Sequence, residues 1–137
     1  MAFGGLVAVE EAMSAPPVTC IASDNIYNIS TIMRERKIGA VIIIGPNRVP
    51  IGIVTEGDIV RKVVAEGKSP HDTTAAEIMT APIISITGDI SIESAARLMA
   101  SNRIKKICIV YLDGSVRGIL TEGDVVRHSG VILGVVR

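Results

Sequence analysis

The stretch GIVTEGDIVR at residues 52–61 recurs as GILTEGDVVR at residues 118–127, so the second copy starts 66 residues (118 − 52) after the first. The same offset relates MSAP at residues 13–16 to MTAP at residues 79–82, and it pairs Met33 with Met99. No gap is needed between Met13 and Arg61 of the first copy. Because one register holds through apolar runs, helical periodicities and turn residues, the chain is interpreted as an internal duplication.

Each copy is predicted to form three strands and two helices in the order β-α-β-β-α. In the first copy the expected strands are short apolar runs rich in β-branched residues: Val18–Ile21, Ala40–Ile44 and Ile51–Val54. Pro46–Arg48 is predicted as a turn. The expected helices are Ile26–Lys37, capped by Asp24 and stopped at Gly39, and a second one over Glu56–Glu66.

The second copy repeats this order. Its expected strands are Ile83–Ile86, Lys106–Tyr111 and Val116–Leu120, and its expected helices are Ile92–Ser101 and one starting at Glu122. The chain is therefore divided into an N-terminal extension (1–12), repeat 1 (13–67), a connector (68–78) and repeat 2 (79–130). Neither copy is large enough to close its own core. We therefore expect one compact α/β (α+β) domain in which two pseudo-symmetric repeats pack sheet to sheet, with two related clefts between them.

Composition excludes several classes of protein. The 137 residues are 48% hydrophobic with a mean hydropathy of +0.48, which excludes a disordered chain. The longest apolar runs, such as Val41–Ile44 and Val131–Val136, are far shorter than the roughly 20 residues that cross a bilayer. No basic segment followed by an apolar stretch opens the chain, so a cytoplasmic protein without membrane insertion is expected.

Charge and side-chain chemistry argue against nucleic-acid binding and against catalysis. Fourteen Lys and Arg balance 14 Asp and Glu, and with two Tyr, one Phe and no Trp the chain offers few stacking surfaces for bases. Cys20 and Cys108 lack the spacing of metal ligands and are interpreted as small apolar side chains in strands. His71 and His128 have no nucleophile or acid at motif spacing. No catalytic residue and no metal site are expected.

The Thr-x-x-Asp pairs, Thr55 with Asp58 and Thr121 with Asp124, carry the sharpest functional hypothesis. Each pair stands where a predicted strand passes into a helix. By local physics alone it is either a capping box, in which Thr and the acid satisfy each other's backbone N–H groups, or a polar ligand site. A capping role does not exclude a ligand role, because the start of the helix is expected to face the cleft.

The duplicated β-α-β-β-α pattern, opening with Met-(Ser/Thr)-Ala-Pro and closing with Gly-Ile-x-Thr-x-x-Asp, resembles a tandem pair of CBS (cystathionine-β-synthase) domains, known as a Bateman module. The resemblance covers about Met13 to His128. It implies a regulatory protein that is not an enzyme and that binds adenosyl ligands in the clefts between its repeats. No tightly bound cofactor is implied, and adenine nucleotide (AMP, ADP or ATP) is the expected regulatory ligand.

The resemblance also assigns roles to residues of this chain. It implies ribose binding by Thr55, Asp58, Thr121 and Asp124, and phosphate binding by Lys105 and Lys106, whose counterparts in the first copy are Gly39 and Ala40. It implies an adenine site with apolar walls from Val18, Ile53, Ile84 and Ile119 and backbone hydrogen bonds from Ala40. Gly57 and Gly123 would let the backbone approach the ligand closely. The resemblance further implies a homodimer and a separately encoded target enzyme or transporter. The alternatives are a ligand-free interaction module, a pair specific for S-adenosylmethionine or NAD, and a nucleic-acid-binding CBS protein, against which the charge and the aromatics count.

Overall fold

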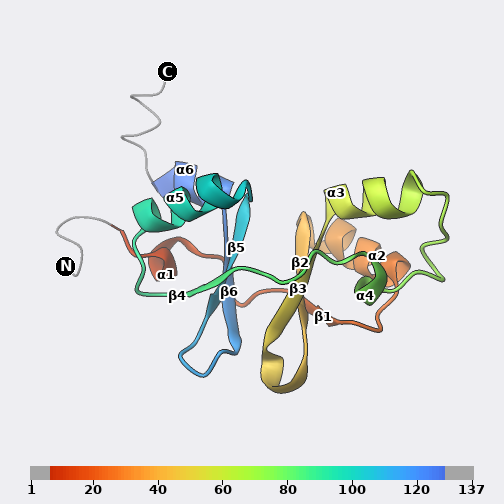
Figure 1. Cartoon of the computed structure of the whole chain (residues 1–137), viewed down its shortest axis with the longest axis horizontal. Helices are drawn as coiled ribbons and strands as arrows, with labels where there is room; N and C mark the ends of the chain where they lie inside the picture. Colours follow the sequence, from red (N-terminus) through yellow and green to blue (C-terminus); the bar gives the residue numbers. More distant parts are fainter. Residues whose placement is uncertain (1–6, 129–137) are drawn as a thin grey trace. The chain divides into compact units, whose positions relative to one another are not determined.

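The structure is a computed structural model that describes residues 7–128. The chain divides into two compact units, one made of Pro17–Ile83 and the other of residues up to Pro16 together with Ile84 onward. Each unit contains a three-stranded sheet with helices, which confirms the mixed α+β class and the two repeats (Figure 1). The apolar run Val131–Val136 lies outside the described residues.

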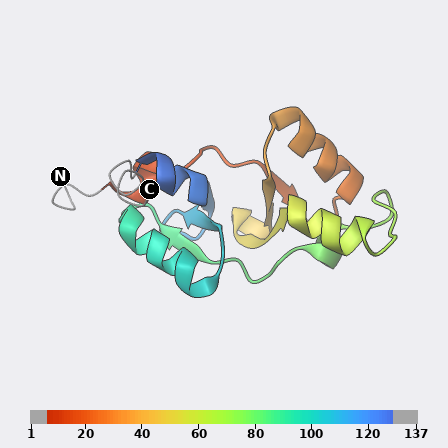
Figure 2. The same cartoon turned by 90° about the horizontal axis from the view of Figure 1, so that it is seen from above.

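The Pro17–Ile83 unit is built on the sheet β1-β2-β3. Its strands are β1 (Thr19–Ile21), β2 (Ala40–Ile44) and β3 (Pro50–Thr55), with β1 parallel and β3 antiparallel to β2. Its helical segments are α2 (Ile26–Arg36), the short turn η1 (Pro46–Arg48), α3 (Glu56–Ile59), the π-helical continuation η2 (Val60–Val64) and α4 (Ala75–Ile78). Figure 2 shows α2 and α3 on the same side of the sheet.

The other unit repeats this arrangement with the sheet β4-β5-β6. Its strands are β4 (Ser85–Thr87), β5 (Lys106–Val110) and β6 (Val116–Thr121), again with one parallel and one antiparallel pairing. Its helices are α5 (Ile92–Asn102), α6 (Glu122–His128) and, from the N-terminal segment, α1 (Val9–Ala12). The N-terminal extension therefore contributes the short helix α1 to this unit.

Alternation along the strands separates two faces of each sheet. In β5 and β6, the residues Ile107, Ile109 and Leu120 join the helices in a buried cluster with Ile92 and Met99. Their neighbours along the strands therefore point to the opposite face, which carries Lys106, Cys108, Ile119 and Thr121. The equivalent face of the first sheet carries Ala40, Ile42, Ile53 and Thr55. Six of the thirteen predicted ligand residues, Ala40, Ile53, Thr55, Lys106, Ile119 and Thr121, belong to these two faces.

Three local details differ from the sequence prediction. Asn25, not Asp24, caps α2, because the Asn25 side chain accepts from the N–H of Asn28 while the Asp24 carboxylate accepts from the N–H of Ile21. The helix ends when Lys37 adopts the left-handed conformation (φ 55°), two residues before the predicted stop at Gly39. The predicted connector contains the short helix α4, whose buried Ala75 and Ile78 complete the core of the Pro17–Ile83 unit.

The opening motif of each repeat packs on the closing strand of the other repeat. Ser14 exchanges both backbone hydrogen bonds with Ile119 of β6 (2.9 and 3.1 Å), and Thr80 does the same with Ile53 of β3 (2.8 and 3.0 Å). The glycine before each isoleucine leaves room for this contact. A Cβ on Gly118 would lie 2.7 Å from Met13 Sδ and 2.8 Å from the carbonyl oxygen of Ser14. The opening motif of repeat 1 therefore docks on the closing strand of repeat 2, and the opening motif of repeat 2 docks on the closing strand of repeat 1. We call this arrangement crosswise docking.

Within residues 7–128, the helices are all too short or too polar to traverse a lipid bilayer.

Candidate functional site

Both Thr-x-x-Asp pairs form capping boxes at a strand-to-helix junction. Thr55 Oγ1 accepts from the N–H of Asp58 (3.1 Å), and Asp58 Oδ2 accepts from the N–H of Thr55 (2.9 Å). Thr121 and Asp124 make the same two bonds at 3.1 and 2.8 Å. Both carboxylates are buried, with 4% and 2% of the residue exposed. The local interpretation as capping boxes is confirmed, and each box fixes one carboxylate oxygen while the other remains for further partners.

Around Asp58, the second oxygen is occupied from two directions. Thr80 Oγ1, from the opening motif docked on β3, donates to Asp58 Oδ1 at 3.2 Å. Lys62, one turn further along the helix, places Nζ 3.1 Å from the same oxygen and also donates to the carbonyl of Ile78 at 2.9 Å. Burial by itself raises the pKa of Asp58, but the bonds from Thr55 and Lys62 outweigh it, so the pKa lies below its ordinary value.

Around Asp124, the second oxygen has a different partner. Arg127, at i+3, forms an ion pair with Asp124 Oδ1. The Arg127 side chain is 66% exposed. The counterparts of Thr80 and Lys62 are Ser14 and His128, and neither side chain is among the hydrogen-bond donors to Asp124 within residues 7–128. The two junctions share their capping geometry and differ in what covers the carboxylate.

The sheet face beside each junction carries further predicted residues. Lys106 pairs with Thr121 across β5 and β6, and Ala40 pairs with Thr55 across β2 and β3. Since paired residues project on the same side of a sheet, Lys106 stands beside the capping box of Asp124, whereas the first junction has an alanine there.

The other predicted residues divide between the two units. The Pro17–Ile83 unit contains the predicted residues Val18, Ala40, Ile53, Thr55, Gly57 and Asp58. The other unit contains Ile84, Lys105, Lys106, Ile119, Thr121, Gly123 and Asp124. The backbone carbonyl of Val18 accepts from the N–H of Ile42 (3.2 Å), and that of Ile84 accepts from the N–H of Cys108 (3.0 Å). These two bonds extend the parallel pairings of β1 with β2 and of β4 with β5. The Arg61 guanidinium lies over Gly57, and a Cβ added at Gly57 would stand 2.7 Å from its nearest nitrogen.

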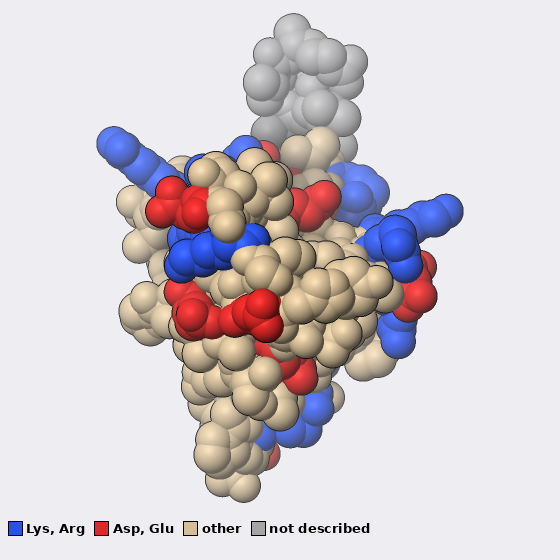
Figure 3. Space-filling model, turned by 90° about the vertical axis from the view of Figure 1, so that its right-hand side faces the viewer, with Lys and Arg blue, Asp and Glu red and all other residues tan. Residues whose placement is uncertain are grey.

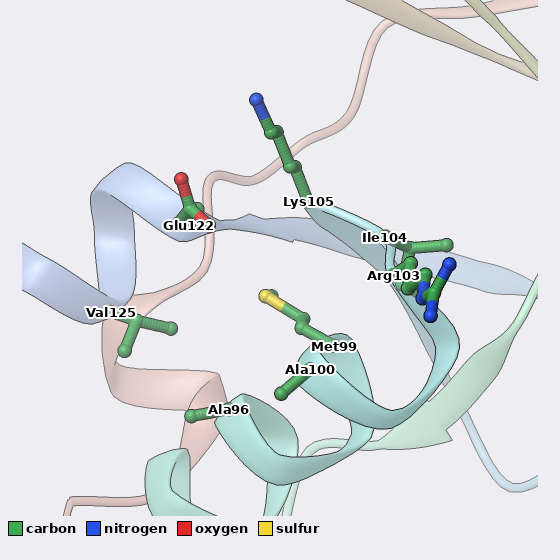
Figure 4. A pocket seen from close by; sticks show the side chains of 8 residues that line it. All are labelled: Ala96, Met99, Ala100, Arg103, Ile104, Lys105, Glu122 and Val125. Carbon is green, nitrogen blue, oxygen red and sulfur yellow. The ribbon is translucent and has the colours of Figure 1, made fainter.

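The structure separates the two adjacent lysines. Lys105 lines a groove of about 380 Å³ between α5 and α6, together with Met99, Arg103, Glu122 and Val125. In Figure 4 Met99 points into this groove and Lys105 extends away from it. The residues at the same offset in the first repeat, including Met33, Glu56 and Ile59, line a groove of about 300 Å³. Both grooves lie on the helical side of their sheets, whereas Lys106 belongs to the opposite face.

Sequence reasoning did not single out Lys62, Thr80 or a carboxylate partnership for Arg127. A signal existed for each of them. Lys62 follows Asp58 at i+4, the spacing of a helical ion pair, and Arg127 follows Asp124 at i+3. Thr80 belongs to the repeated MTAP motif, but its contact with Asp58 depends on the crosswise docking of that motif.

The remaining chemistry of the described residues is sparse. Cys20 and Cys108 are free, and burial raises the pKa of each thiol to about 11. Residues 7–128 contain no group of three or more His, Cys, Asp or Glu arranged to hold a metal ion. On the face shown in Figure 3, Lys and Arg are interspersed with Asp and Glu, so neither sign of charge dominates it.

Comparison with known proteins agrees with this architecture. The CBS domain family matches residues 9–65 and 75–131. Protein MJ0653 of Methanocaldococcus jannaschii is 44% identical over 130 residues, which span 95% of this chain and 66% of that protein. The mitochondrial CBS domain-containing protein CBSX3 of Arabidopsis thaliana is 32% identical over 112 residues, 79% of this chain and 54% of that protein. This chain thus spans less than two thirds of the length of these relatives.

Solved structures extend the similarity to the fold. The CBS domain pair of protein MJ0100, in complex with 5′-methylthioadenosine and S-adenosyl-L-methionine, superposes with a TM-score of 0.83 at 28% identity, covering 93% of this chain and 98% of that one. Two matched repeats, two α+β units and a capped Thr-x-x-Asp at each junction define a tandem CBS pair. The chain belongs to the CBS domain family.

Proposed function

We propose that this CBS pair is a regulatory sensor that binds adenosyl ligands and has no catalytic activity of its own. AMP, ADP and ATP are the first candidates, and S-adenosylmethionine and NAD are the alternatives. In this proposal the ribose hydroxyls bind the carboxylates of the Thr-x-x-Asp pairs. An ionised carboxylate only accepts hydrogen bonds, so it suits two neighbouring hydroxyl donors.

The observation that carries the proposal is the buried carboxylate at each junction. Asp58 and Asp124 are buried at the edge of a sheet face, beside a docked backbone segment and an apolar strand residue, Ile53 or Ile119. Similarity to the MJ0100 pair, which was solved in complex with two adenosyl compounds, supports the same ligand class here. The apolar residues would contact the base and the carboxylate the sugar.

Lys106 favours a phosphorylated ligand at the second junction. It projects on the same face as Thr121, so its ammonium group can reach a phosphate attached to a ribose on Asp124. Lysine supplies a point charge that suits phosphate oxygens without fixing their geometry. Lys105, which lines the helical groove, stays a weaker candidate for the same role.

The capping boxes also support a second candidate, an interaction module that binds no ligand. In that case Asp58 and Asp124 only stabilise helix starts, and replacing either would cost about 0.5–2 kcal/mol of stability with no effect on any ligand. Dependence of affinity on Asp124 beyond this loss of stability separates the two candidates.

We further propose a homodimer formed through the helices. Val60, Val64 and Val126 are apolar, and 57%, 68% and 43% of each is exposed. Val60 lines the groove of the Pro17–Ile83 unit, with Val64 four residues further on, and Val126 follows Val125, which lines the groove of the other unit. Exposed apolar patches mark interaction surfaces. Isologous dimers are the commonest symmetric outcome.

The proposed partner of the sensor is a separately encoded enzyme or transporter that it regulates. The proposed location is the cytoplasm, which the free buried thiols of Cys20 and Cys108 suit.

Isothermal titration of nucleotide-free protein with AMP, ADP, ATP, S-adenosylmethionine and NAD tests the proposed function. Saturable binding of a phosphorylated adenosine, weakened by Asp124→Asn and by Lys106→Met, is the expected result. Lys68→Met is the matched control, because it removes one exposed lysine from the loop after η2 of the other unit. Folded protein that binds none of the five compounds would contradict the sensor function.

A further inference from the structure

The two junctions offer a ligand different numbers of free acceptor positions on the carboxylate. An ionised carboxylate has about four lone-pair positions for hydrogen bonds. Asp58 already accepts from three donors, namely the N–H of Thr55, the hydroxyl of Thr80 and the ammonium of Lys62. Asp124 accepts from two, the N–H of Thr121 and the guanidinium of Arg127.

A ribose presents two neighbouring hydroxyl donors, so it needs two acceptor positions. On this count about one position remains on Asp58 and about two remain on Asp124. Binding at Asp58 must therefore displace Thr80 or Lys62, whereas binding at Asp124 displaces nothing.

The partners of the two carboxylates also differ in how easily they leave. Lys62 is held at two points, since the same Nζ donates to the carbonyl of Ile78 at 2.9 Å. Thr80 is fixed by its two backbone bonds to Ile53. Within residues 7–128, Asp124 is the one hydrogen-bond or ion-pair partner of the Arg127 side chain, and two thirds of that side chain is exposed. Its guanidinium can therefore turn into water without breaking any other bond.

Charge adds to this difference. Asp58 is neutralised by an adjacent Lys62, and the sheet position beside Thr55 is Ala40. At the other junction the sheet position beside Thr121 is Lys106. The first junction therefore has its one ammonium group already engaged, and the second has an ammonium group available for an anionic ligand.

We propose that this chain takes one adenosyl ligand, at Asp124, and that Lys62 together with Thr80 closes the equivalent position at Asp58. The inference rests on the proposed function and specifies which junction performs it. The Asp58 cluster instead ties the opening motif of the second repeat to the helix after β3.

Calorimetric stoichiometry on the full chain tests this, with AMP and S-adenosylmethionine as the probes. The unmodified protein is expected to bind one equivalent per chain, and Asp124→Asn to weaken that event roughly ten- to hundredfold. Lys62→Met keeps the aliphatic stem and frees one position on Asp58, so a second equivalent is expected. Arg61→Met is the matched control, because its guanidinium lies over Gly57 and forms no bond to Asp58; its stoichiometry is expected to stay at one.

Each failure has a distinct meaning. Two equivalents in the unmodified protein, or one equivalent in Lys62→Met, would overturn the closed position and leave the sensor function intact. A single event that survives Asp124→Asn unchanged would overturn it as well. Absence of binding of both probes to folded, nucleotide-free protein would remove the proposed function and this inference with it. Because Lys62→Met leaves both capping boxes in place, the test does not depend on a variant that lacks a helix cap.

Discussion

Replacing Gly118 by alanine tests the crosswise docking of the opening motif on β6. The added Cβ would stand 2.7 Å from Met13 Sδ and 2.8 Å from the carbonyl oxygen of Ser14. The sulfur belongs to a flexible side chain and can move. The carbonyl belongs to backbone that is held by two hydrogen bonds to Ile119, so the strand or the segment must shift.

The expected magnitude follows from two opposing effects. Forcing a methyl group into a filled contact costs about 1–3 kcal/mol. Alanine also lowers the conformational entropy of the unfolded chain, which stabilises the folded state by about 0.4–1 kcal/mol. We therefore expect Gly118→Ala to lower the free energy of unfolding by about 1–2 kcal/mol.

Two matched glycines give the expected ranking. At Gly52 the Cβ would lie 2.6 Å from Met79 Sδ but 3.1 Å from the backbone oxygen of Thr80, so a smaller loss is expected. At Gly123 the nearest atoms are 3.5 Å or more away, and the position is helical, so alanine should cause no loss.

Urea denaturation of ligand-free protein, followed by circular dichroism and extrapolated linearly, measures the three free energies of unfolding. The expected order of destabilisation is Gly118→Ala, then Gly52→Ala, then Gly123→Ala. Met13→Ala in the Gly118→Ala background should recover only part of the loss, because the backbone contact persists. A Gly118→Ala protein as stable as Gly123→Ala would refute the docking argument.

Three further outcomes follow from burial and charge. Since the folded-state pKa of Asp58 is depressed, its contribution to stability is present above its unfolded pKa of about 3.9 and is lost as pH falls through the folded value. Lys62→Met should raise that pKa and move the acid unfolding midpoint, followed by circular dichroism, to higher pH. Leu120→Ala, in a fully buried position, should cost about 2–5 kcal/mol and lower Tm in calorimetry. Val64→Glu should weaken the proposed dimer, measured by light scattering, without unfolding the chain.

Each of these has a control in the same molecule. Arg61→Met removes a neighbouring positive charge that forms no bond to Asp58, so its acid midpoint should stay near that of the unmodified protein. Leu112→Ala, at a position 96% exposed, should leave Tm unchanged. Val49→Glu, at an exposed position in the turn between β2 and β3, should leave the dimer intact. Equal effects of a variant and its control would contradict the corresponding prediction.

Local patterns account for most of the correct sequence predictions. The predicted strand Ala40–Ile44 has the same bounds as β2, and the predicted helices starting at Ile26 and Ile92 begin at the same residues as α2 and α5. Apolar spacing and turn residues act through neighbours a few positions away, so they can be read directly. The misassigned cap at Asp24 shows the limit, because two adjacent residues with capping side chains differ only in how the chain enters the helix.

The partners of the candidate site could not be read in this way. Asp58 and Asp124 have nearly the same local sequence, and both form the predicted capping box. Lys105 and Lys106 are adjacent in sequence, yet Lys105 lines the groove on the helical side, whereas Lys106 opens β5 and projects on the opposite face. The predicted start of this strand at Lys106 is confirmed, but which side of the sheet the helices cover is decided by tertiary packing.

The sequence by itself determined the duplication, the order of the elements and the family resemblance, because repeated local interactions leave a repeated pattern. Only the tertiary structure decided that each opening motif docks on the other repeat's closing strand. That choice brings Thr80 to Asp58 across 22 residues of chain, and beside it Lys62 bridges Asp58 to Ile78. Contacts between distant segments depend on how whole units pack, so two similar motifs acquired different surroundings.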